Sequence, residues 1–316
     1  MLLVIIVVAV LIFTSGSAPA KDNPTPVYAG IEWPWEAPDT STIPNNEEGD
    51  LIRYGREILT HTAVYFGPLG KVAKVSNGMS CQNCHLESGT KQWGNNYGAV
   101  SSMYPKFRRR SGTVESIEKK INDCFERSMN GSIIDSNGRE MKAMIAYMHW
   151  LGKDVNKGKV PLGTGLAPLP YLDRAADTVR GKVVFVQKCA LCHGATGQGL
   201  TDTLTGIGYT YPPLWGEHSY NTGAGIYRVG KFASYVKDNM PFGASHIQTQ
   251  LTDAEAWDVA AYVNSRPRTH MEFKEDWPDL SLKPVDHPFG PYTDTFSEQQ
   301  HKYGPFKPIE KARNAK

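Results

Sequence analysis

The chain has 316 residues, of which 40% are hydrophobic and 21% charged, and its formal net charge at pH 7 is +2. This length suits two domains that each bury a core, and a charge so close to zero argues against a protein that binds nucleic acid or an acidic membrane surface. The 30 glycines and 21 prolines predict helices separated by long irregular loops.

The N-terminus is predicted to be an export signal, residues 1–20. An apolar run from Leu2 to Phe13 is followed by Ala18-Pro19-Ala20, which resembles a signal-peptide cleavage site. The run is short for a bilayer span, although a retained anchor is the alternative because no Lys or Arg precedes it. We therefore expect a periplasmic protein without stable membrane insertion.

Residues 21–49 are predicted to form an extended arm, whose Trp33-Pro34-Trp35 packs on the domain that follows. That first domain, residues 50–153, opens with helical periodicity over Leu51–Leu59. Downstream lies the pentad Cys81-Gln82-Asn83-Cys84-His85. C-x-x-C-H is the attachment signature of a c-type haem, in which two thiols bond the porphyrin and the histidine binds the iron.

A helix carrying the unpaired Cys124 is predicted between Thr113, which can cap its N-terminus, and Asn130-Gly131, which ends it. Ile117 and Cys124 are two turns apart on the same side of such a helix, so Cys124 faces inward. The closing helix of this domain is predicted over Arg139–Leu151, where Met141, Met144, Ile145, Met148 and Leu151 repeat with helical spacing.

The segment 154–172 is rich in Gly and Pro and is predicted to be a linker. The second domain, residues 173–266, repeats the order of the first: a helix from Thr178, the pentad Cys189-Ala190-Leu191-Cys192-His193, and a last helix that opens with the capping box Thr252-x-x-Glu255. Residues 267–316 lack periodicity and are predicted to wrap over the surface.

The two pentads predict two covalently bound haem c groups, with His85 and His193 as the proximal iron ligands. A zinc site or a disulfide is the alternative for an isolated C-x-x-C, but the adjacent histidine and the repetition favour haem. Met240 precedes Pro241 in a loop and is predicted to bind the second iron from the other side, which raises the reduction potential. Lys237 and His246 are rival ligands, and a core methionine is the remaining alternative.

Three interpretations of Cys124 compete at the first haem. It is a buried free thiol, a partner in an intermolecular disulfide, or a distal thiolate ligand that brings sulfur chemistry to the iron. Basic residues lie close to it in the sequence: Lys106 and Arg108-Arg109-Arg110 precede its helix, and Lys120 lies one turn before it. Such a run is either a solvated face or a binding site for an oxyanion.

Two stretches resemble the dihaem thiosulfate dehydrogenases: Ile121 to Gly131 around Cys124, and Pro105 to Gly112 upstream. The resemblance covers nearly the whole mature chain. It implies a mainly α-helical protein with two cytochrome c-like haem domains, a first haem bound by histidine and cysteine, and a second bound by histidine with methionine or lysine. It also implies an enzyme that couples two thiosulfates into tetrathionate, reversibly in some members.

Carried onto this chain, the resemblance makes Cys124 the distal ligand and catalytic sulfur, and Arg110 and Ser128 the residues that hold thiosulfate oxygens. Lys120 stands where some members have arginine, so the charge is kept and the bidentate geometry is lost. Asn239 replaces a lysine found before the methionine in some members, which favours Met240 as the ligand.

The resulting hypothesis has thiosulfate enter between the domains, form a sulfur–sulfur bond to Cys124, and leave as tetrathionate after a second thiosulfate attacks. Electrons then pass from the first haem to the second and to a soluble c-type cytochrome or similar acceptor. A dihaem electron carrier without a substrate is the runner-up, and a dihaem peroxidase is a third possibility for which no acid–base residue stands out.

Overall fold

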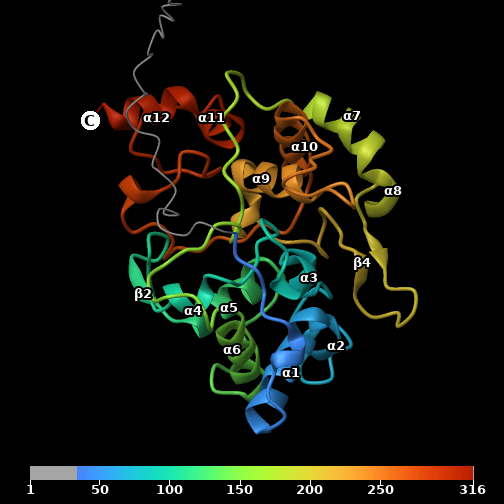
Figure 1. The fold of residues 1–316 in the computed structure, drawn as a ribbon. Helices are drawn as coiled ribbons and strands as arrows, with labels where there is room; N and C mark the ends of the chain where they lie inside the picture. The colour runs from blue at the N-terminus through green and yellow to red at the C-terminus, as the bar shows by residue number, and fades with distance from the viewer. Residues whose placement is uncertain (1–33, 316) are drawn as a thin grey trace, which may run out of the picture.

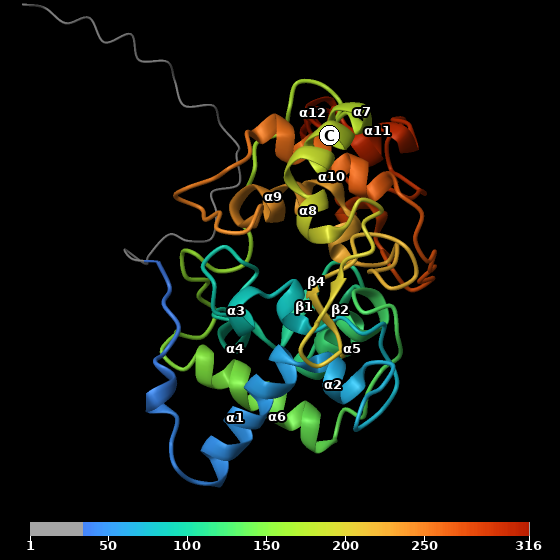
Figure 2. The ribbon, with the colours of Figure 1, turned by 90° about the vertical axis from the view of Figure 1, so that its right-hand side faces the viewer.

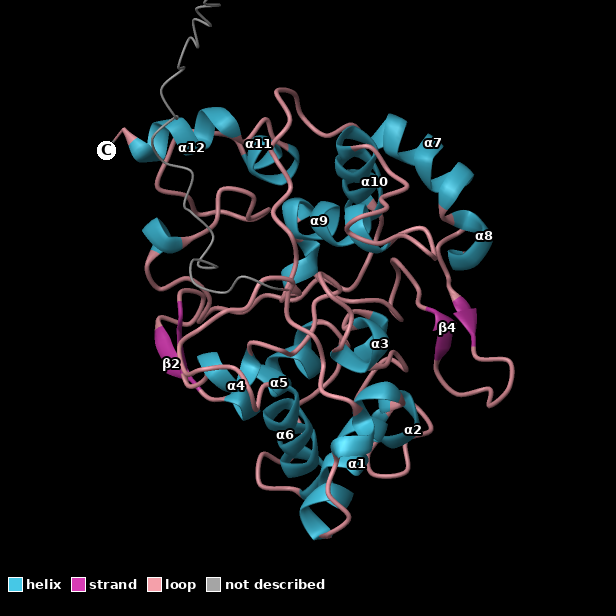
Figure 3. Cartoon of the chain, in the orientation of Figure 1, coloured by secondary structure: helices cyan, strands magenta, loops and turns pink. Residues whose placement is uncertain are grey.

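The computed structural model describes residues 34–315, which form two mainly helical units stacked one on the other (Figure 1). Figure 3 shows that strands are few and that loops make up much of the chain. The first unit contains α1 (Glu47–Thr60), α2 (Thr62–Phe66), α3 (Leu86–Gly89), α4 (Val100–Met103), β1 (Lys106–Arg108), β2 (Thr113–Glu115), α5 (Ile117–Arg127) and α6 (Arg139–Leu151), with short 3₁₀ turns at Thr40–Thr42 and Cys81–Asn83.

The second unit repeats this order and adds a C-terminal extension. It contains α7 (Thr178–Lys188), α8 (Ala190–His193), β3 (Leu200–Thr201), β4 (Tyr209–Tyr211), α9 (Val229–Asn239), α10 (Asp253–Ser265), α11 (Glu298–Tyr303) and α12 (Lys307–Asn314), with 3₁₀ turns at Gly225–Tyr227 and Leu280–Leu282. Each two-stranded sheet is antiparallel. The predicted capping box of α10 is present: the Thr252 hydroxyl accepts from the Glu255 N–H, and the Glu255 carboxylate accepts from the Thr252 N–H.

Both units are built on one helix crossing, in which a glycine lets two backbones touch. A Cβ added to Gly55 in α1 would lie 1.9 Å from the Ala143 carbonyl oxygen of α6. In the second unit, a Cβ on Gly181 in α7 would lie 1.9 Å from the Asp258 carbonyl oxygen of α10. Real Cβ atoms do not approach oxygen so closely, so each crossing requires glycine and brings the haem-attachment segment after α1 or α7 against the closing helix.

Replacing Gly181 with alanine is expected to destabilise the second unit by about 2 kcal/mol, the usual cost of forcing an extra methyl group into a packed interface. Denaturant unfolding of the holoprotein measures the change. Lys182→Ala in the exposed next position of α7 is the matched control and should change stability by less than about 0.5 kcal/mol. Equal stability of the Gly181→Ala and Lys182→Ala variants would contradict the close crossing.

Figure 2 shows the second unit stacked on the first. The loops around the first attachment site make polar contacts with the second unit. The Asn77 side chain donates to the Ser219 carbonyl oxygen at 3.1 Å, and the Tyr235 hydroxyl donates to the Asn83 carbonyl oxygen at 3.1 Å. Asn239 donates to the Trp93 carbonyl oxygen at 3.0 Å. Helix α9 of the second unit is therefore held against the haem-attachment loop of the first.

The helix that carries Cys124 begins later than predicted. Thr113–Glu115 forms strand β2, which pairs with β1 across a tight turn, because β-branched Thr113 and Val114 suit a strand better than a first helical turn. Ser116 caps α5 instead, its hydroxyl accepting from the Lys119 N–H at 3.3 Å. The predicted helices over Leu51–Leu59, Arg139–Leu151 and from Thr178 are confirmed by α1, α6 and α7.

The C-terminal segment is more ordered than its lack of periodicity predicts. Helices α11 and α12 form within it, and Phe306 and Ile309 are buried in the core of the second unit. Two apolar anchors among lysines and glutamates are too few to show periodicity. At the other end, Trp35 is buried in the first core, as predicted, whereas Trp33 and the predicted signal segment lie outside the described residues.

Among residues 34–315, no helix is long and apolar enough to cross a membrane.

Candidate haem sites and active site

The first attachment site is built so that His85 is oriented and neutral. Its Nδ1 lies 2.5 Å from the Asn95 carbonyl oxygen, which leaves Nε2 free for a metal. Burial lowers the pKa of His85 to about 4. The Tyr97 ring stacks on the imidazole with a centroid distance of 4.5 Å, and this requires Gly89, which has φ +80° and whose added Cβ would lie 2.0 Å from that ring.

The second attachment site opens into a cavity of about 870 Å³. Cys189, Cys192 and His193 line it, as does Met240, the residue that follows α9. The His193 Nδ1 lies 2.8 Å from the Pro212 carbonyl oxygen, so this imidazole also keeps Nε2 free. Two thiols, an oriented imidazole and a thioether around one large cavity fit a covalently bound haem.

Cys84 of the first pentad lines the same cavity. The two attachment sites are therefore neighbours across the boundary between the units, although more than a hundred residues separate them in the sequence.

The rival ligands at the second site are engaged elsewhere. The Lys237 ammonium donates to the Leu251 carbonyl oxygen at 2.7 Å and pairs with Asp253 at 2.8 Å. His246 lies 3.3 Å from the Asp238 carboxylate, and its ring is tilted against that of Trp93 with a centroid distance of 5.1 Å. Met240 is the side chain of this loop with a free sulfur in the cavity.

Replacing Met240 with histidine is expected to lower the reduction potential of the second haem by on the order of 0.1 V or more, because a thioether ligand favours the reduced iron more than an imidazole does. Potentiometric titration followed by absorption measures it. Lys237→Ala is the control, because that ammonium is held by Asp253. A reduction potential that changes in Lys237→Ala and stays unchanged in Met240→His would show that Met240 is not the iron ligand.

Cys124 faces the first attachment site from α5, as the helical spacing predicts. Ile121 and Phe125 beside it are buried in the first core, and Cys124 itself is half-buried. Burial raises the pKa of the Cys81 and Cys84 thiols to about 12, and the nearby Cys124 contributes to both shifts. The thiol therefore lies close to both haem-attachment cysteines.

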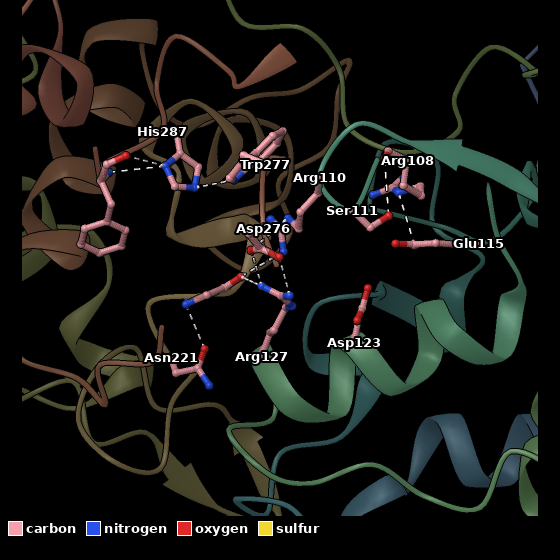
Figure 4. Close-up of polar contacts among 12 residues, drawn as sticks. Arg108, Arg110, Ser111, Glu115, Asp123, Arg127, Asn221, Asp276, Trp277 and His287 are labelled. Atoms are coloured by element: carbon pink, nitrogen blue, oxygen red, sulfur yellow. Dashed lines mark hydrogen bonds and ion pairs between the residues drawn. The ribbon is translucent and has the colours of Figure 1, made fainter. Parts of the chain in front are cut away.

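A basic cluster is built on Arg127, which follows Cys124 by one turn of α5. Figure 4 shows Arg127 and Arg110 meeting at Asp276. Arg127 is buried and donates to the two Asp276 carboxylate oxygens at 2.7 and 2.8 Å. Arg110 reaches the same carboxylate at 3.9 Å and donates to the Gly223 carbonyl oxygen at 3.1 Å. Burial, with a contribution from the charge of Arg127, lowers the pKa of Arg110 to about 10, so the Arg110 guanidinium remains charged at neutral pH.

The comparisons with known proteins agree with this architecture. Residues 71–156 match the family described as "SoxA/TsdA, cytochrome c domain", and residues 178–267 match the family described as "Cytochrome c". Thiosulfate dehydrogenase from Psychrobacter arcticus is 39% identical over 77% of this chain and 71% of its own. The enzyme of the same name from Allochromatium vinosum is 37% identical over 73% of this chain and 83% of its own.

The chain belongs to the thiosulfate dehydrogenase family. It consists of two cytochrome c domains that carry two covalently bound haem c groups. A solved structure of thiosulfate dehydrogenase (TsdBA) from Marichromatium purpuratum in its "as isolated" form superposes with a TM-score of 0.67 at 33% identity. That match covers 73% of this chain and 49% of the solved one, so the chain spans about half the length of that structure.

In this thiosulfate dehydrogenase family member, the other predicted site residues lie on the Cys124 side of α5 or in the hairpin before it. Ser128 is half-buried, and its N–H donates to the Cys124 carbonyl oxygen at 2.9 Å. Lys120 is half-buried and pairs with no described carboxylate. Burial is the main cause of the lowered pKa of His85, and the positive charge of Lys120 lowers that pKa as well. Arg108 lies 3.8 Å from Glu115 across the β1–β2 hairpin, and Arg109 is exposed.

Sequence reasoning missed Arg127 and its partners. Arg127 lies three residues after Cys124, and this spacing alone could have placed it beside the thiol. Asp276 and Phe273, whose ring lies 3.6 Å from the Arg127 guanidinium, come from a segment without periodicity. Residues 267–316, which were predicted to wrap over the surface, therefore supply part of the wall of the candidate active site.

Proposed function

We propose that this protein is an exported, periplasmic enzyme that oxidises thiosulfate by coupling two molecules into tetrathionate, with Cys124 as the sulfur that carries the first. The observation that carries this proposal is the position of Cys124: it faces the first haem-attachment site and has the Arg110–Arg127–Asp276 cluster one helical turn away. The four other cysteines belong to the two pentads, so Cys124 is the thiol left for chemistry.

Covalent catalysis divides the coupling of two dianions into two steps. In the first, the Cys124 thiolate and the sulfane sulfur of thiosulfate form an S–S bond, and two electrons are given up. In the second, the sulfane sulfur of another thiosulfate attacks the adduct sulfur that is bonded to the Cys124 Sγ. The bond between that sulfur and the Sγ breaks, which releases tetrathionate and regenerates the thiolate. Haem groups held by Cys81, Cys84 and His85 at the first site, and by Cys189, Cys192, His193 and Met240 at the second, would supply the redox chemistry that this scheme needs and the route for electrons to an external acceptor.

The side chains around Cys124 suit this task because they offset the repulsion between anions. Arg110 and Lys120 provide positive charge on two sides of the face of α5 that carries Cys124, and Ser128 provides a hydroxyl donor. The Arg127 Nε is a buried donor with no partner among the described residues. Buried donors are normally satisfied, so this one is available to an oxygen of a bound sulfonate.

The mouth of the second cavity suits a protein acceptor. Leu191 of the second pentad, Phe242 and Ile247 are 98%, 84% and 95% exposed, and Phe242 also lines the cavity. Exposed apolar side chains gathered around a redox group are typical of a transient docking surface. We infer that a soluble c-type cytochrome or similar acceptor docks here.

The proposal is tested by mixing the oxidised holoprotein with thiosulfate and a cytochrome-type acceptor, and measuring both acceptor reduction and tetrathionate. One tetrathionate is expected for every two electrons delivered. Acceptor reduction without tetrathionate, or turnover with peroxide in place of thiosulfate, would contradict it and favour an electron carrier or a peroxidase. The reverse assay, with tetrathionate and a reduced donor, together with the two haem potentials, establishes the favoured direction.

A further inference from the structure

A second cavity, of about 390 Å³, lies where the C-terminal extension covers the basic cluster. We call it the tail cavity. Its lining comes from Arg110 of the first unit, the Thr222–Arg228 segment of the second, and residues 270–291 of the extension. Trp277 forms part of its wall and is fixed to the first unit, because its N–H donates to the Arg110 carbonyl oxygen at 2.6 Å.

Lys283 is the unusual residue of this cavity. It is only 3% exposed, and its ammonium donates to one neutral acceptor, the Pro291 carbonyl oxygen, at 3.1 Å. The ammonium also lies 5.2 Å from the Tyr292 ring, and the charges of Asp276 and Glu298 act on it from beyond ion-pair distance. Lysine is almost never buried unless it is paired, yet no described carboxylate lies within ion-pair distance of it. A buried ammonium beside an open cavity is suited to binding an anion there.

Two guanidinium groups accompany Lys283. Arg110 is shared with the cluster beside Cys124, and Arg228 is held in place by Asp286, whose carboxylate accepts from the Arg228 Nε at 2.8 Å. All three cations act on His287 in the cavity wall: burial, together with the charges of Lys283, Arg110 and Arg228, lowers the pKa of this imidazole to about 3. The neutral His287 accepts from the Trp277 indole N–H at 3.0 Å.

The position of the tail cavity relates it to the reaction. Coupling two thiosulfates needs two sulfonate positions, one for the molecule bonded to Cys124 and one for the molecule that attacks it. Arg110 lines the tail cavity and also belongs to the cluster beside Cys124, so it lies between the two positions.

We propose that the tail cavity is the binding site for the second thiosulfate, with Lys283 and Arg110 holding its sulfonate while its sulfane sulfur points toward Cys124. This inference rests on the proposed function. In the step that this cavity serves, the sulfane sulfur of the incoming thiosulfate bonds to the adduct sulfur attached to the Cys124 Sγ. The bond between that adduct sulfur and the Sγ then breaks. The Sγ keeps the electron pair as a thiolate, and no further oxidant is consumed.

The test compares holoprotein carrying Lys283→Gln with wild type and with Lys311→Gln. The control removes the same charge from an exposed position of α12. Thiosulfate, and separately sulfate, are titrated while the thermal midpoint is recorded. We expect both anions to stabilise wild type and the control, and the stabilisation to be lost in Lys283→Gln. Without anion, Lys283→Gln should be as stable as wild type or more so, because a buried unpaired charge is costly.

Kinetics provide the second measurement. In Lys283→Gln the thiosulfate concentration at half-maximal rate should rise about tenfold, while a single thiosulfate still bonds to Cys124, as detected by mass spectrometry of the isolated peptide. Lys283→Arg should restore most of the anion stabilisation. If the glutamine variant does not fold, Lys283→Met replaces it in both measurements.

Equal stabilisation of Lys283→Gln and wild type by thiosulfate would overturn the inference, as would lost stabilisation with unchanged half-saturation, because the cavity would then bind an anion that is not the substrate. Failure of the proposed function looks different. In that case wild type makes no tetrathionate at all, whereas the anion titration still reports on the cavity.

Discussion

Cys124→Ser should retain both haems and lose thiosulfate oxidation by at least roughly 10³-fold in kcat, the scale seen when a covalent nucleophile is removed. The haems remain because their attachment uses the cysteines of the two pentads. A serine oxygen is close in size to the sulfur, so the packing of α5 against Ile121 and Phe125 should change little. Steady-state acceptor reduction, with haem content measured by absorption, gives the result.

The matched control for this variant is Ser128→Ala, which removes a hydroxyl from the same face of α5 and leaves the Cys124 thiol in place. It should lose far less activity, about tenfold, because one hydrogen bond to the substrate is at stake. Full turnover by Cys124→Ser with both haems bound would refute the covalent scheme and leave Cys124 as a packed free thiol.

Asp276→Ala should lower the free energy of unfolding by about 3 kcal/mol, because removing one partner of a buried ion pair leaves the other charge uncompensated. The charge left behind is Arg127, whose side chain is 8% exposed. The same change releases Arg110, and kcat/KM for thiosulfate should fall by roughly one to two orders of magnitude, since small misplacements of a binding group have effects of that size.

Denaturant unfolding and thiosulfate kinetics of the holoprotein measure these two effects. Glu275→Ala is the control: this exposed carboxylate is next to Asp276 in the sequence but does not line the tail cavity, and its loss should change neither quantity appreciably. An Asp276→Ala variant with wild-type stability would contradict the buried pair, whereas lost stability with unchanged kinetics would show that the extension supports the fold and not the site.

Sequence reasoning located the parts of the site that depend on local pattern. Each pentad places two thiols and an imidazole within five consecutive residues, so its chemistry requires no knowledge of the fold. The position of Cys124 follows from helical spacing, because Ile117, Ile121 and Phe125 identify the buried side of α5. The closing helix of the first unit was equally predictable, since α6 forms over the residues that its periodicity indicates.

Contacts between distant segments could not be predicted in this way. Asp276 pairs with Arg127 across 149 residues, and the extension that supplies it carries no helical or strand period around that position. Lys283 is a more instructive case. Lysine is expected at the surface, and only the three-dimensional arrangement of the extension reveals that this one is buried beside a cavity. The β1–β2 hairpin was missed because Thr113 was interpreted as a helix cap, although β-branched Thr113 and Val114 favour a strand.

The central claim is that Cys124 bonds covalently to thiosulfate, and peptide mass spectrometry tests it most directly. The oxidised holoprotein is mixed with thiosulfate, quenched in acid and digested, and the peptide that contains Cys124 is weighed before and after treatment with a thiol reductant. We predict a mass increase equal to one S₂O₃ unit on Cys124 that the reductant removes. An enzyme that forms tetrathionate while Cys124 stays unmodified at every time sampled would contradict the account.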